Sequence, residues 1–548
     1  MKNIESKISH LLLALLFLQA LQAQNKSQDS DRPKLMIGLV VDQMRWDFLY
    51  RYPEKYGKDG FNRILSNGFS CEQTYIHHSP TITAPGHASI FTGSVPGIHG
   101  IAGNNWYDCQ SKKDVYCVYD STVQTIGSAT KAGWMSPRNL KTTTICDELR
   151  LATNFKSKTI GIALKDRGAI LPAGHTANAA FWFDGGTGKW VSSSYYMTDL
   201  PPWVHQYNEE KNAIRYVENN WNTLLPISQY HESHEDDAEF EATLTGEQKP
   251  VFIHQLNETA KTNYGIIRYT PFGNTLTFDL AQRAIQQEKL GKGNHTDFIT
   301  ISLSSPDYIG HQFGPNSIEI EDNYIRLDKD IAAFLTFLDK EIGKDNYLLF
   351  LTADHGAAHV PAFMNRNKLP AGIVAIDSLI AGVNTFIKNE MGITQAVITE
   401  ANHQLYLNKD NIPTASKEII KKKIQQWLEN KAGISRVIDL DNMDNHLLPQ
   451  LFREKIVNGW YPGRSGDMFI MYEPGWFDGF NKGTTHSVLY PYDTHIPLLF
   501  YGKGIRKGKS FREIHMADIA PTVAALLNIQ TPNGTIGKVI TEIFKNKR

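Results

Sequence analysis

LMIGLVVD, from Leu35 to Asp42, is a run of seven apolar residues, one of them glycine, that ends in an acid. Unbroken apolar runs, as opposed to alternating ones, are typical of strands buried on both faces, as in a parallel sheet. Three further runs have this character: TIGIALK (159–165), FITISL (298–303) and YLLFLTAD (347–354). The sequence therefore predicts several buried strands of one sheet.

Helical patterns separate these strands. The clearest has apolar residues from Tyr324 to Ile342 at spacings of three and four, which place one apolar face on a sheet. Alternating strands and helices predict an α/β fold with a mostly parallel central sheet and helices on both faces. We expect one catalytic domain over 33–548, with inserted cap subdomains at about 170–285 and 360–480, where the pattern is irregular.

Composition limits the class of protein. The chain has 548 residues, 41% hydrophobic and 11% aromatic, which is typical of a globular protein with a large core. A formal net charge of -1 provides no general attraction to nucleic acid or to an anionic membrane. We therefore predict no nucleic-acid partner, and any anion must be bound locally. The sequence does not determine the oligomeric state, for which a monomer is the working expectation.

The first 23 residues predict a cleaved secretory signal. Lys2 and Lys7 precede an apolar run from Leu11 to Leu18, and Ala23 is a small residue at a suitable cleavage position. An uncleaved anchor is the alternative, but the run is well short of the roughly 20 residues that a spanning helix needs. We therefore predict a periplasmic or secreted protein without a stable membrane anchor.

Four cysteines lie in one early part of the chain: Cys71, Cys109, Cys117 and Cys146. An even number of cysteines in an exported chain predicts disulfides. Cys109 and Cys117 flank a short polar loop and would be the easy local pair, leaving Cys71 with Cys146. Three pairings are possible, and the sequence does not choose between them.

Residue types that bind metal ions gather near the predicted strand ends, where ligands bind in α/β sheets. The six candidate ligands are Asp42, Asp307, His311, Asp354, His355 and His486. Asp307 and His311 are four residues apart, a spacing that one helical turn can aim at a single ion. Taken alone, an acid such as Asp42 is most often a helix cap. The set as a whole predicts two zinc ions with three protein ligands each, both open to substrate.

Thr83, in the stretch TITAPGHASIFTG (81–93), is the candidate nucleophile. A threonine hydroxyl is a poor nucleophile near neutral pH, but a divalent cation favours its alkoxide. Pro85 suits the first turn of a helix, whose free N–H groups and positive dipole would face a bound anion. A simple N-cap role is the alternative for Thr83. The nearby ligand set favours the nucleophile.

The order of these residues, together with Asn104 in IAGNNW, resembles the alkaline phosphatase superfamily. It is similar in particular to the bacterial alkaline phosphatases that use threonine in place of serine, the PafA-like monoesterases. The resemblance spans nearly all of the mature chain. It implies that Thr83 becomes phosphorylated and that the amide of Asn104 hydrogen-bonds a non-bridging phosphate oxygen.

The resemblance also implies how two zinc ions are held. One would be bound by Asp307, His311 and His486, and the other by Asp42, Asp354, His355 and Thr83. The second ion would activate Thr83 for attack on phosphorus. The first would stabilise the leaving oxygen and then activate the water that releases phosphate from the phosphothreonine.

Lys165 and Arg167, in ALKDRGA, are two cations that would influence whether a monoester or a diester is cleaved. A monoester dianion has an extra charged oxygen that a diester replaces with a carbon substituent, so cations favour the monoester. In the PafA-like branch a Lys-x-Arg at this strand end contacts the phosphate, and the nucleotide pyrophosphatase/phosphodiesterase branch lacks it. A solvated loop is the simpler alternative. The resemblance implies a phosphomonoesterase, with a phosphodiesterase or nucleotide pyrophosphatase as the alternative.

Other members of the superfamily fit less well. Sulfatases need a cysteine or serine that matures to formylglycine, which Thr83 cannot form. Cofactor-independent phosphoglycerate mutases are cytoplasmic and use serine. A phosphate-binding protein without turnover is a further hypothesis, but no expected ligand or nucleophile is missing. We therefore predict an exported two-zinc alkaline phosphatase that acts on a broad range of phosphate monoesters.

Overall fold

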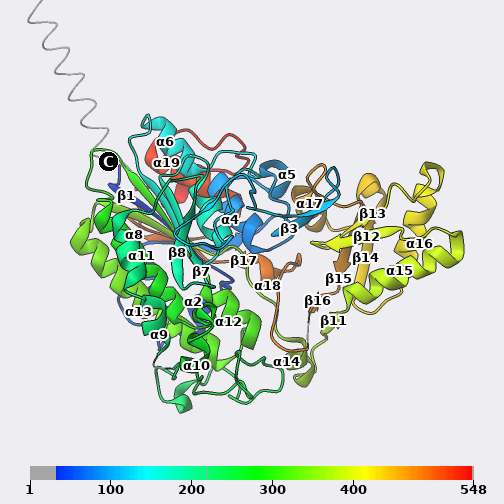
Figure 1. Ribbon diagram of the computed structural model, residues 1–548, viewed down its shortest axis with the longest axis horizontal. Coiled ribbons are helices and arrows are strands. Elements are labelled where there is room, and N and C mark those ends of the chain that lie inside the picture. The colour runs from blue at the N-terminus through cyan, green and yellow to red at the C-terminus, as the bar shows by residue number, and fades with distance from the viewer. Residues whose placement is uncertain (1–31, 219, 480, 546–548) are drawn as a thin grey trace, which may run out of the picture.

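An eleven-stranded mixed sheet runs through the larger lobe of the protein (Figure 1). This computed structural model describes residues 32–545, except 219 and 480. Five neighbouring strands are parallel and form the middle of the sheet, in the order β10 (Tyr347–Thr352), β1 (Leu35–Val41), β9 (Asp297–Leu303), β6 (Thr159–Ala163) and β7 (Ala179–Asp184). The four strands predicted from apolar runs are all among these five. The predicted α/β fold with a mostly parallel central sheet is confirmed.

Shorter or antiparallel strands extend both sides of this middle. Beyond β10 lie β18 (Leu498–Gly502), β2 (Phe69–Tyr75) and β17 (His495–Ile496), and beyond β7 lie β8 (Lys189–Ser193) and β5 (Thr125–Ile126). The last strand, β19 (Gly508–His515), pairs parallel with β2. The antiparallel pairs of this sheet therefore all lie on its two sides, outside the parallel middle.

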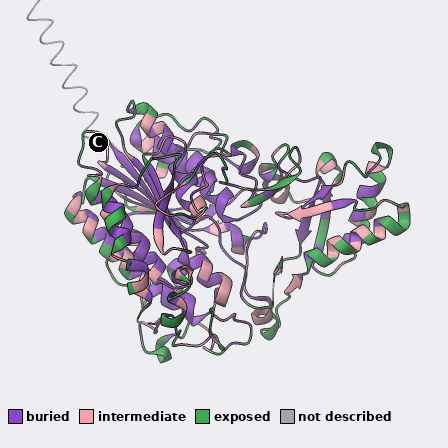
Figure 2. Ribbon diagram, viewed as in Figure 1, coloured by how far each residue is buried: buried purple, intermediate pink, exposed green. Residues whose placement is uncertain are grey.

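The register of the parallel strands brings their carboxyl ends to one edge. Val41 of β1 is opposite Leu303 of β9, and Val40 is opposite Thr352 of β10. All seven residues of β1 are buried, because neighbouring strands and covering helices enclose it (Figure 2). Side chains that directly follow these strands must therefore lie close together.

Helices cover both faces of the sheet. On one side, α11 (Phe272–Gln287) packs against α13 (Ile318–Glu341), and on the other, α4 (Thr83–Thr92) packs against α7 (Asp166–Ala173) and α19 (Ile519–Leu527) (Figure 1). The helix predicted around 324–342 is the C-terminal part of α13. Its expected apolar face is buried, including Leu327, Ile331 and Phe334. Helical periodicity thus correctly identified the surface that faces the sheet.

A smaller lobe lies at the other end of the molecule (Figure 1). Its antiparallel sheet has the order β12 (Val397–Ala401), β13 (Gln404–Leu407), β15 (Met468–Tyr472) and β14 (Ile434–Asp439), and is accompanied by α15 (Ile376–Met391) and α16 (Lys417–Glu429). Val383, Ile424 and Val437 belong to a separate hydrophobic core. This lobe comes from the range 360–480. The range 170–285, in contrast, contributes β7, β8 and α11 to the larger lobe, and its irregular part lies between β8 and α11.

The predicted disulfides are wrong: all four cysteines, which lie within the described residues, are free. The local pair fails because of a hairpin. β3 (Asn105–Asp108) pairs with β4 (Lys113–Tyr116), so that Asp108 is opposite Lys113 and Asn105 is opposite Tyr116. Cys109 therefore lies at the turn and Cys117 at the open end, level with Asn104, which is five residues or about 16 Å along the strand. A disulfide requires Cα atoms no more than about 7 Å apart.

Two expectations concern the membrane and the N-terminus. Among the residues that the structure describes, no helix has the length and apolar character needed to cross a membrane. The predicted signal peptide, with cleavage near Ala23, lies outside the described residues.

Candidate active site

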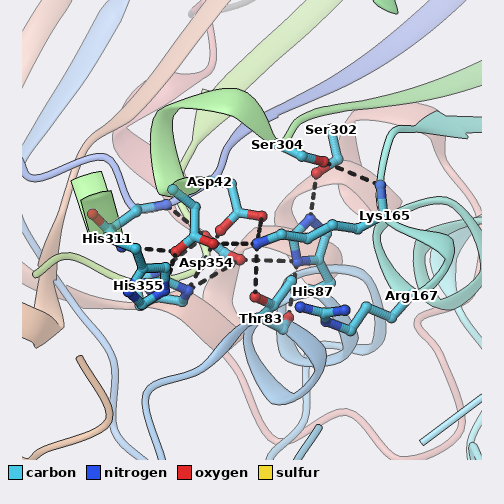
Figure 3. A network of polar contacts seen from close by, with 12 residues as sticks. Asp42, Thr83, His87, Lys165, Arg167, Ser302, Ser304, His311, Asp354 and His355 are labelled. Atoms are coloured by element: carbon cyan, nitrogen blue, oxygen red, sulfur yellow. Dashed lines mark hydrogen bonds and ion pairs between the residues drawn. The ribbon is translucent and has the colours of Figure 1, made fainter. Parts of the chain in front are cut away.

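The carboxyl edge of the parallel strands carries a cluster of buried charges (Figure 3). Asp42 directly follows β1, Asp354 follows β10, and Lys165 follows β6. Asp307 comes from α12 (Ser305–Phe313), which begins just after β9. All four side chains are buried. The sheet register therefore brings together four of the residues that the sequence singled out.

Asp42, Asp354 and His355 form the first candidate ligand group. One ligand atom from each residue lies within 4.8 Å of the others. Asp42 Oδ1, Asp354 Oδ2 and His355 Nε2 are buried and have no hydrogen-bond partner among the described residues. Buried polar atoms almost always have such a partner, so three exceptions in one place call for an explanation. Two carboxylates and an imidazole are a donor set that suits a divalent cation such as zinc.

Asp307, His311 and His486 form the second candidate group. Asp307 Oδ1 lies 3.2 Å from His311 Nε2 and 3.4 Å from His486 Nε2. His355 stands between the two groups, because its ring stacks on that of His486 with centroids 3.5 Å apart. A ligand atom of His355 also lies within 4.8 Å of those of Asp307 and His486. The two groups are thus adjacent, and the six predicted ligands form one continuous cluster.

All three histidines are held in the same way. The Nδ1 atoms of His311, His355 and His486 lie 2.8, 2.9 and 2.7 Å from the backbone oxygens of Thr484, Gly356 and Thr81. An Nδ1–H that donates to a carbonyl fixes the tautomer and leaves the Nε2 lone pair for a metal ion. Burial lowers the pKa of His355 to about 3, so its imidazole stays neutral. The histidines therefore fit the role of metal ligands.

The charges of the cluster do not balance. With every group in its ordinary ionised form, Asp42, Asp307 and Asp354 carry three negative charges against the single positive charge of Lys165. Lys165 Nζ lies 2.7 Å from Asp42 Oδ2 and 2.5 Å from Asp307 Oδ2. Burial alone would lower the pKa of Lys165, but these two carboxylates raise it above its ordinary value. Burial and the carboxylate of Asp354 raise the pKa of Asp42. Bound cations would relieve this repulsion.

Thr83 faces the cluster from the first position of α4 (Figure 3). Its side chain is buried, and Lys165 Nζ lies 3.4 Å from Oγ1. The N-cap residue is Ile82, so Thr83 does not have the simple capping role that was the alternative. The approach of α4 depends on Gly86, since a Cβ atom there would lie 2.4 Å from the carbonyl oxygen of Asp354. The hydroxyl of Thr83 is thus placed beside the candidate ligands.

The N-terminus of α4 offers fewer free donors than expected. The N–H of Ala84 donates to Asn104 Oδ1 at 2.9 Å, and Pro85 has no N–H. This bond uses the carbonyl side of the Asn104 amide, which leaves the NH₂ side for a ligand. A ligand at this helix end would therefore meet the NH₂ group of Asn104 in place of the N–H of Ala84.

Lys165 and Arg167 both lie at the start of α7, with Lys165 as its N-cap residue. Arg167 Nη1 donates to the hydroxyl of Tyr116 at 3.1 Å, which holds the guanidinium near the site. A cavity of about 540 Å³ is lined by Lys165, Arg167, Arg268 and Tyr308, among others. This cavity gives the two predicted phosphate-binding cations access to a ligand.

Sequence reasoning missed two residues of the cluster, Gln43 and His87. Gln43 Nε2 donates to Asp307 Oδ1 at 2.7 Å, and its backbone N–H donates to Asp354 Oδ1 at 3.2 Å. His87 Nδ1 forms a hydrogen bond with the carbonyl oxygen of Thr83 at 2.9 Å. It also lies 3.2 Å from Asp354 Oδ2, but this contact does not have hydrogen-bond geometry. His87, four residues after Thr83 in the same motif, could have been found from helical spacing. Gln43 has a φ of 64°, which no sequence pattern indicated.

Known proteins resemble this chain along nearly its full length. The family model for type I phosphodiesterase / nucleotide pyrophosphatase matches residues 36–495. The alkaline phosphatase PhoV of Synechococcus elongatus is 48% identical, covering 98% of this chain and all of the relative. The alkaline phosphatase PafA of Elizabethkingia meningoseptica is 47% identical, covering 97% and 98%. The crystal structure of wild-type PafA matches with a TM-score of 0.92 at 48% identity, covering 94% of this chain and 99% of that one.

These similarities confirm the predicted resemblance and the predicted function at the level of alkaline phosphatase. The match to the structure also confirms the fold independently of the strand predictions. The chain therefore belongs to the type I phosphodiesterase / nucleotide pyrophosphatase family of the alkaline phosphatase superfamily.

Proposed function

We propose that this protein hydrolyses phosphate monoesters with Thr83 as nucleophile, at a site that binds two zinc ions. The observation that carries the proposal is the set of three buried ligand atoms without a hydrogen-bond partner in the described chain, on Asp42, Asp354 and His355, beside the hydroxyl of Thr83. Asp307, His311 and His486 complete the six proposed ligands. Asp and His donors also suit other divalent ions. The identification of the two ions as zinc is therefore a more specific claim than the presence of two metal ions.

When bound, two divalent cations would act as Lewis acids that favour the threonine alkoxide and stabilise the leaving oxygen. Thr83 Oγ1 then attacks phosphorus, a bond from Oγ1 to phosphorus forms, and the bond from phosphorus to the ester oxygen breaks. The ester oxygen leaves as an alkoxide and takes up a proton from solvent, which balances the proton that the Thr83 hydroxyl releases to solvent. A water molecule next attacks the phosphothreonine, which releases inorganic phosphate and regenerates the Thr83 hydroxyl.

Three side chains would bind the phosphoryl oxygens in this reaction. The NH₂ group of Asn104, oriented by its bond to Ala84, would donate to a non-bridging oxygen. Lys165 is charged and lies 3.4 Å from Thr83 Oγ1, and Arg167 is held nearby by Tyr116. Donors placed where charge develops stabilise the transition state. A monoester, which presents one more charged oxygen than a diester, gains most from the two cations.

Two cavities support broad specificity for the alcohol part. One, of about 540 Å³, opens onto Lys165 and Arg167. Another, of about 600 Å³, is lined by His311 and Thr484 on the larger lobe and by Ile376 and Asp478 near the smaller lobe. We propose that the smaller lobe, within the range 360–480, acts as a cap over this approach. The irregular part of the range 170–285 would form the other side of the entrance.

The proposal is tested by comparing an aryl phosphate monoester with its methyl diester, on protein whose metal content is measured by elemental analysis. We expect about two zinc ions per chain and a clear preference for the monoester. A preference for the diester would favour the phosphodiesterase or nucleotide pyrophosphatase alternative. Two zinc ions with no turnover of any ester would favour a phosphate-binding protein.

We also propose export to the periplasm or beyond the cell. The support is the N-terminal pattern of two lysines, an apolar run and a small residue near Ala23. N-terminal sequencing of the protein from a periplasmic fraction tests this. A chain that retains its first residues in the cytoplasmic fraction would contradict it.

A further inference from the structure

A second group of metal-binding side chains lies outside the candidate active site. It consists of His77, Glu513 and His515, whose ligand atoms all lie within 4.8 Å of one another. Glu513 Oε1 is 3.0 Å from His77 Nε2 and 3.6 Å from His515 Nε2. None of these residues is among the six ligands proposed for the active site.

The pairing of β19 with β2 brings the three side chains together. In this parallel pair Glu513 is opposite Gln73 and His515 is opposite Tyr75. Alternate residues of a strand point to the same face, so Glu513 and His515 share a face of β19. His77 lies two residues beyond Tyr75, and its ring stacks on that of His515 with centroids 3.4 Å apart. The fold thus places one acid and two imidazoles at the same end of the two strands.

The side of the cluster formed by His77 is firmly held. His77 is buried, and its Nδ1 atom lies 3.2 Å from the carbonyl oxygen of Tyr75. An Nδ1–H that donates there leaves Nε2 for a metal ion, the arrangement found in all three active-site histidines. The carbonyl oxygen of His77 in turn accepts a hydrogen bond from Asn458 Nδ2 at 2.7 Å.

Nearby basic side chains are engaged elsewhere. The guanidinium of Arg512, adjacent in β19, pairs with the carboxylate of Glu542. The ammonium of Lys455 donates to the carbonyl oxygen of Leu489 at 2.9 Å and to Thr494 Oγ1 at 3.3 Å. The contacts of the Glu513 carboxylate are with His77 and His515. A cation bound there would therefore displace no arginine or lysine.

We propose that His77, Glu513 and His515 form a third divalent-metal site. Two imidazoles and one carboxylate favour a borderline ion such as zinc over calcium or magnesium, which prefer oxygen ligands. Only three protein ligands are present and Glu513 is exposed, so the site would be weaker than a closed structural site and would have water in its open position.

The position of this site indicates a structural role. The segment from His77 leads to Thr83, and the N–H of Ser79 donates to the carbonyl oxygen of Lys455 in α17 (Gln450–Gly459) at 3.0 Å. A metal ion bound at His77 would tie β19 to this segment, which contacts α17 on one side and precedes the nucleophile on the other. It would stabilise the protein without touching the substrate.

The test is equilibrium dialysis of the complete mature protein, without the signal peptide, against increasing free zinc. Zinc per chain is measured by elemental analysis. We compare the wild type with His515→Ala, which removes a partly exposed ligand. The wild type should bind one more zinc per chain than the variant at saturation. Calcium in the same dialysis should not fill the additional site. The difference between two proteins is diagnostic whatever the number of ions in the active site.

The matched control is His205→Ala. His205 Nε2 lies 3.1 Å from Asp199 Oδ1, but this surface pair belongs to no group of three ligands in the described chain. This variant should bind as much zinc as the wild type. Glu513→Gln, which keeps the shape of the side chain, provides a second variant should His515→Ala misfold. Equal zinc contents in the wild type and the ligand variants at every concentration would overturn the proposal.

Discussion

Two buried lysines, one in each lobe, have almost the same immediate partners. Lys165 lies 2.7 Å from Asp42 and 2.5 Å from Asp307, and Lys421 lies 2.6 Å from both Asp439 and Asp441. Both lysine side chains are 2% exposed. The ion pairs alone therefore do not distinguish a candidate catalytic site from a structural contact.

The two sites differ in whether the carboxylate oxygens around the lysine have further hydrogen-bond partners. Asp439 also accepts hydrogen bonds from the N–H of Asp441 at 3.0 Å and from Asn442 Nδ2 at 2.8 Å. Asp42 Oδ1, in contrast, has no hydrogen-bond partner in the described part of the chain and lies 3.5 Å from His355 Nε2. A polar cluster whose acceptors are satisfied stabilises a fold, whereas unsatisfied acceptors beside imidazoles indicate a place for a ligand.

Buried histidines in the two lobes show the same contrast. Burial lowers the pKa of His355 in the larger lobe to about 3 and that of His403 in the smaller lobe to about 4. His403 Nε2 lies 2.7 Å from Ser487 Oγ, and its ring meets Tyr472 edge-on. His355 Nε2 has no hydrogen-bond partner among the described residues. The contrast predicts that substitutions in the larger lobe affect turnover and those in the smaller lobe affect stability.

The largest effect is expected for Thr83→Ala. Loss of the nucleophile should reduce monoester turnover by about 10³-fold or more, since only slower direct attack by water would remain. Acid-quenched wild-type protein should show a phosphorylated Thr83 by mass spectrometry, and the variant should not. Thr92→Ala, in the same helix, removes a hydroxyl bonded to the carbonyl oxygen of Ala88 and should retain activity. A phosphorylated residue other than Thr83 would refute its assignment.

His355→Ala should lower both metal content and turnover. Removal of one of three ligands weakens metal binding, and we expect a loss of about 10²- to 10³-fold in turnover that excess zinc partly restores. His403→Gln, which replaces the comparable buried histidine of the smaller lobe, should bind as much zinc as the wild type. Measured zinc per chain checks both variants. An unchanged zinc content in His355→Ala would remove this histidine from the ligand set.

Lys165→Ala should reduce monoester kcat/KM by about 10²-fold, because a donor to the transition state is lost. The effect on the methyl diester should be less than about tenfold, since the diester lacks the extra charged oxygen. The two substrates are assayed on the same preparation, so that a partly misfolded fraction cancels in the ratio. Equal losses for both esters would contradict a role of Lys165 in recognising the monoester.

Lys421→Met should act on stability instead. Breaking a buried ion pair costs about 3–5 kcal/mol, and the loss here should be smaller, about 2–3 kcal/mol, because Asp441 is half-exposed. The free energy of unfolding is measured by urea denaturation, and kcat should stay within about twofold of the wild type. A loss of activity in the folded variant would show that the two lobes are more tightly coupled than the contrast implies.

The smallest expected effect is a change in pH dependence on replacing His403. The imidazole has a pKa of about 4 in the folded protein and about 6.5 in the unfolded chain, so the unfolded state binds more protons below pH 6.5. Stability that is present above pH 6.5 is therefore lost as the pH falls towards 4. Between pH 7 and 4.5, His403→Gln should lose about 2 kcal/mol less than the wild type in urea denaturation. Identical losses would indicate that His403 is protonated in the folded protein.

Local patterns predicted much of the fold because they report burial directly. Leu35–Val41 is apolar throughout and becomes a central strand, and the spacing from Tyr324 to Ile342 becomes the buried face of α13. The same reasoning described the range 170–285 as irregular and did not predict β7 and β8 within it. β7, Ala179–Asp184, is nevertheless buried along its whole length. This reasoning also made Cys109 and Cys117 the easiest of the possible disulfide pairs, because spacing alone does not reveal which end of a hairpin a residue occupies.

The sequence by itself determined which donors are present, in what order, and at the ends of which strands. Residue type and periodicity are local properties, and they are enough to single out Asp42, Thr83 and Asp354. The tertiary structure decided which of their atoms meet and which are left without a partner. That outcome depends on the register of parallel strands and on contacts such as Gln43 with Asp307 and His355 with His486. Those contacts join residues far apart in the chain, and only a packed sheet brings them together.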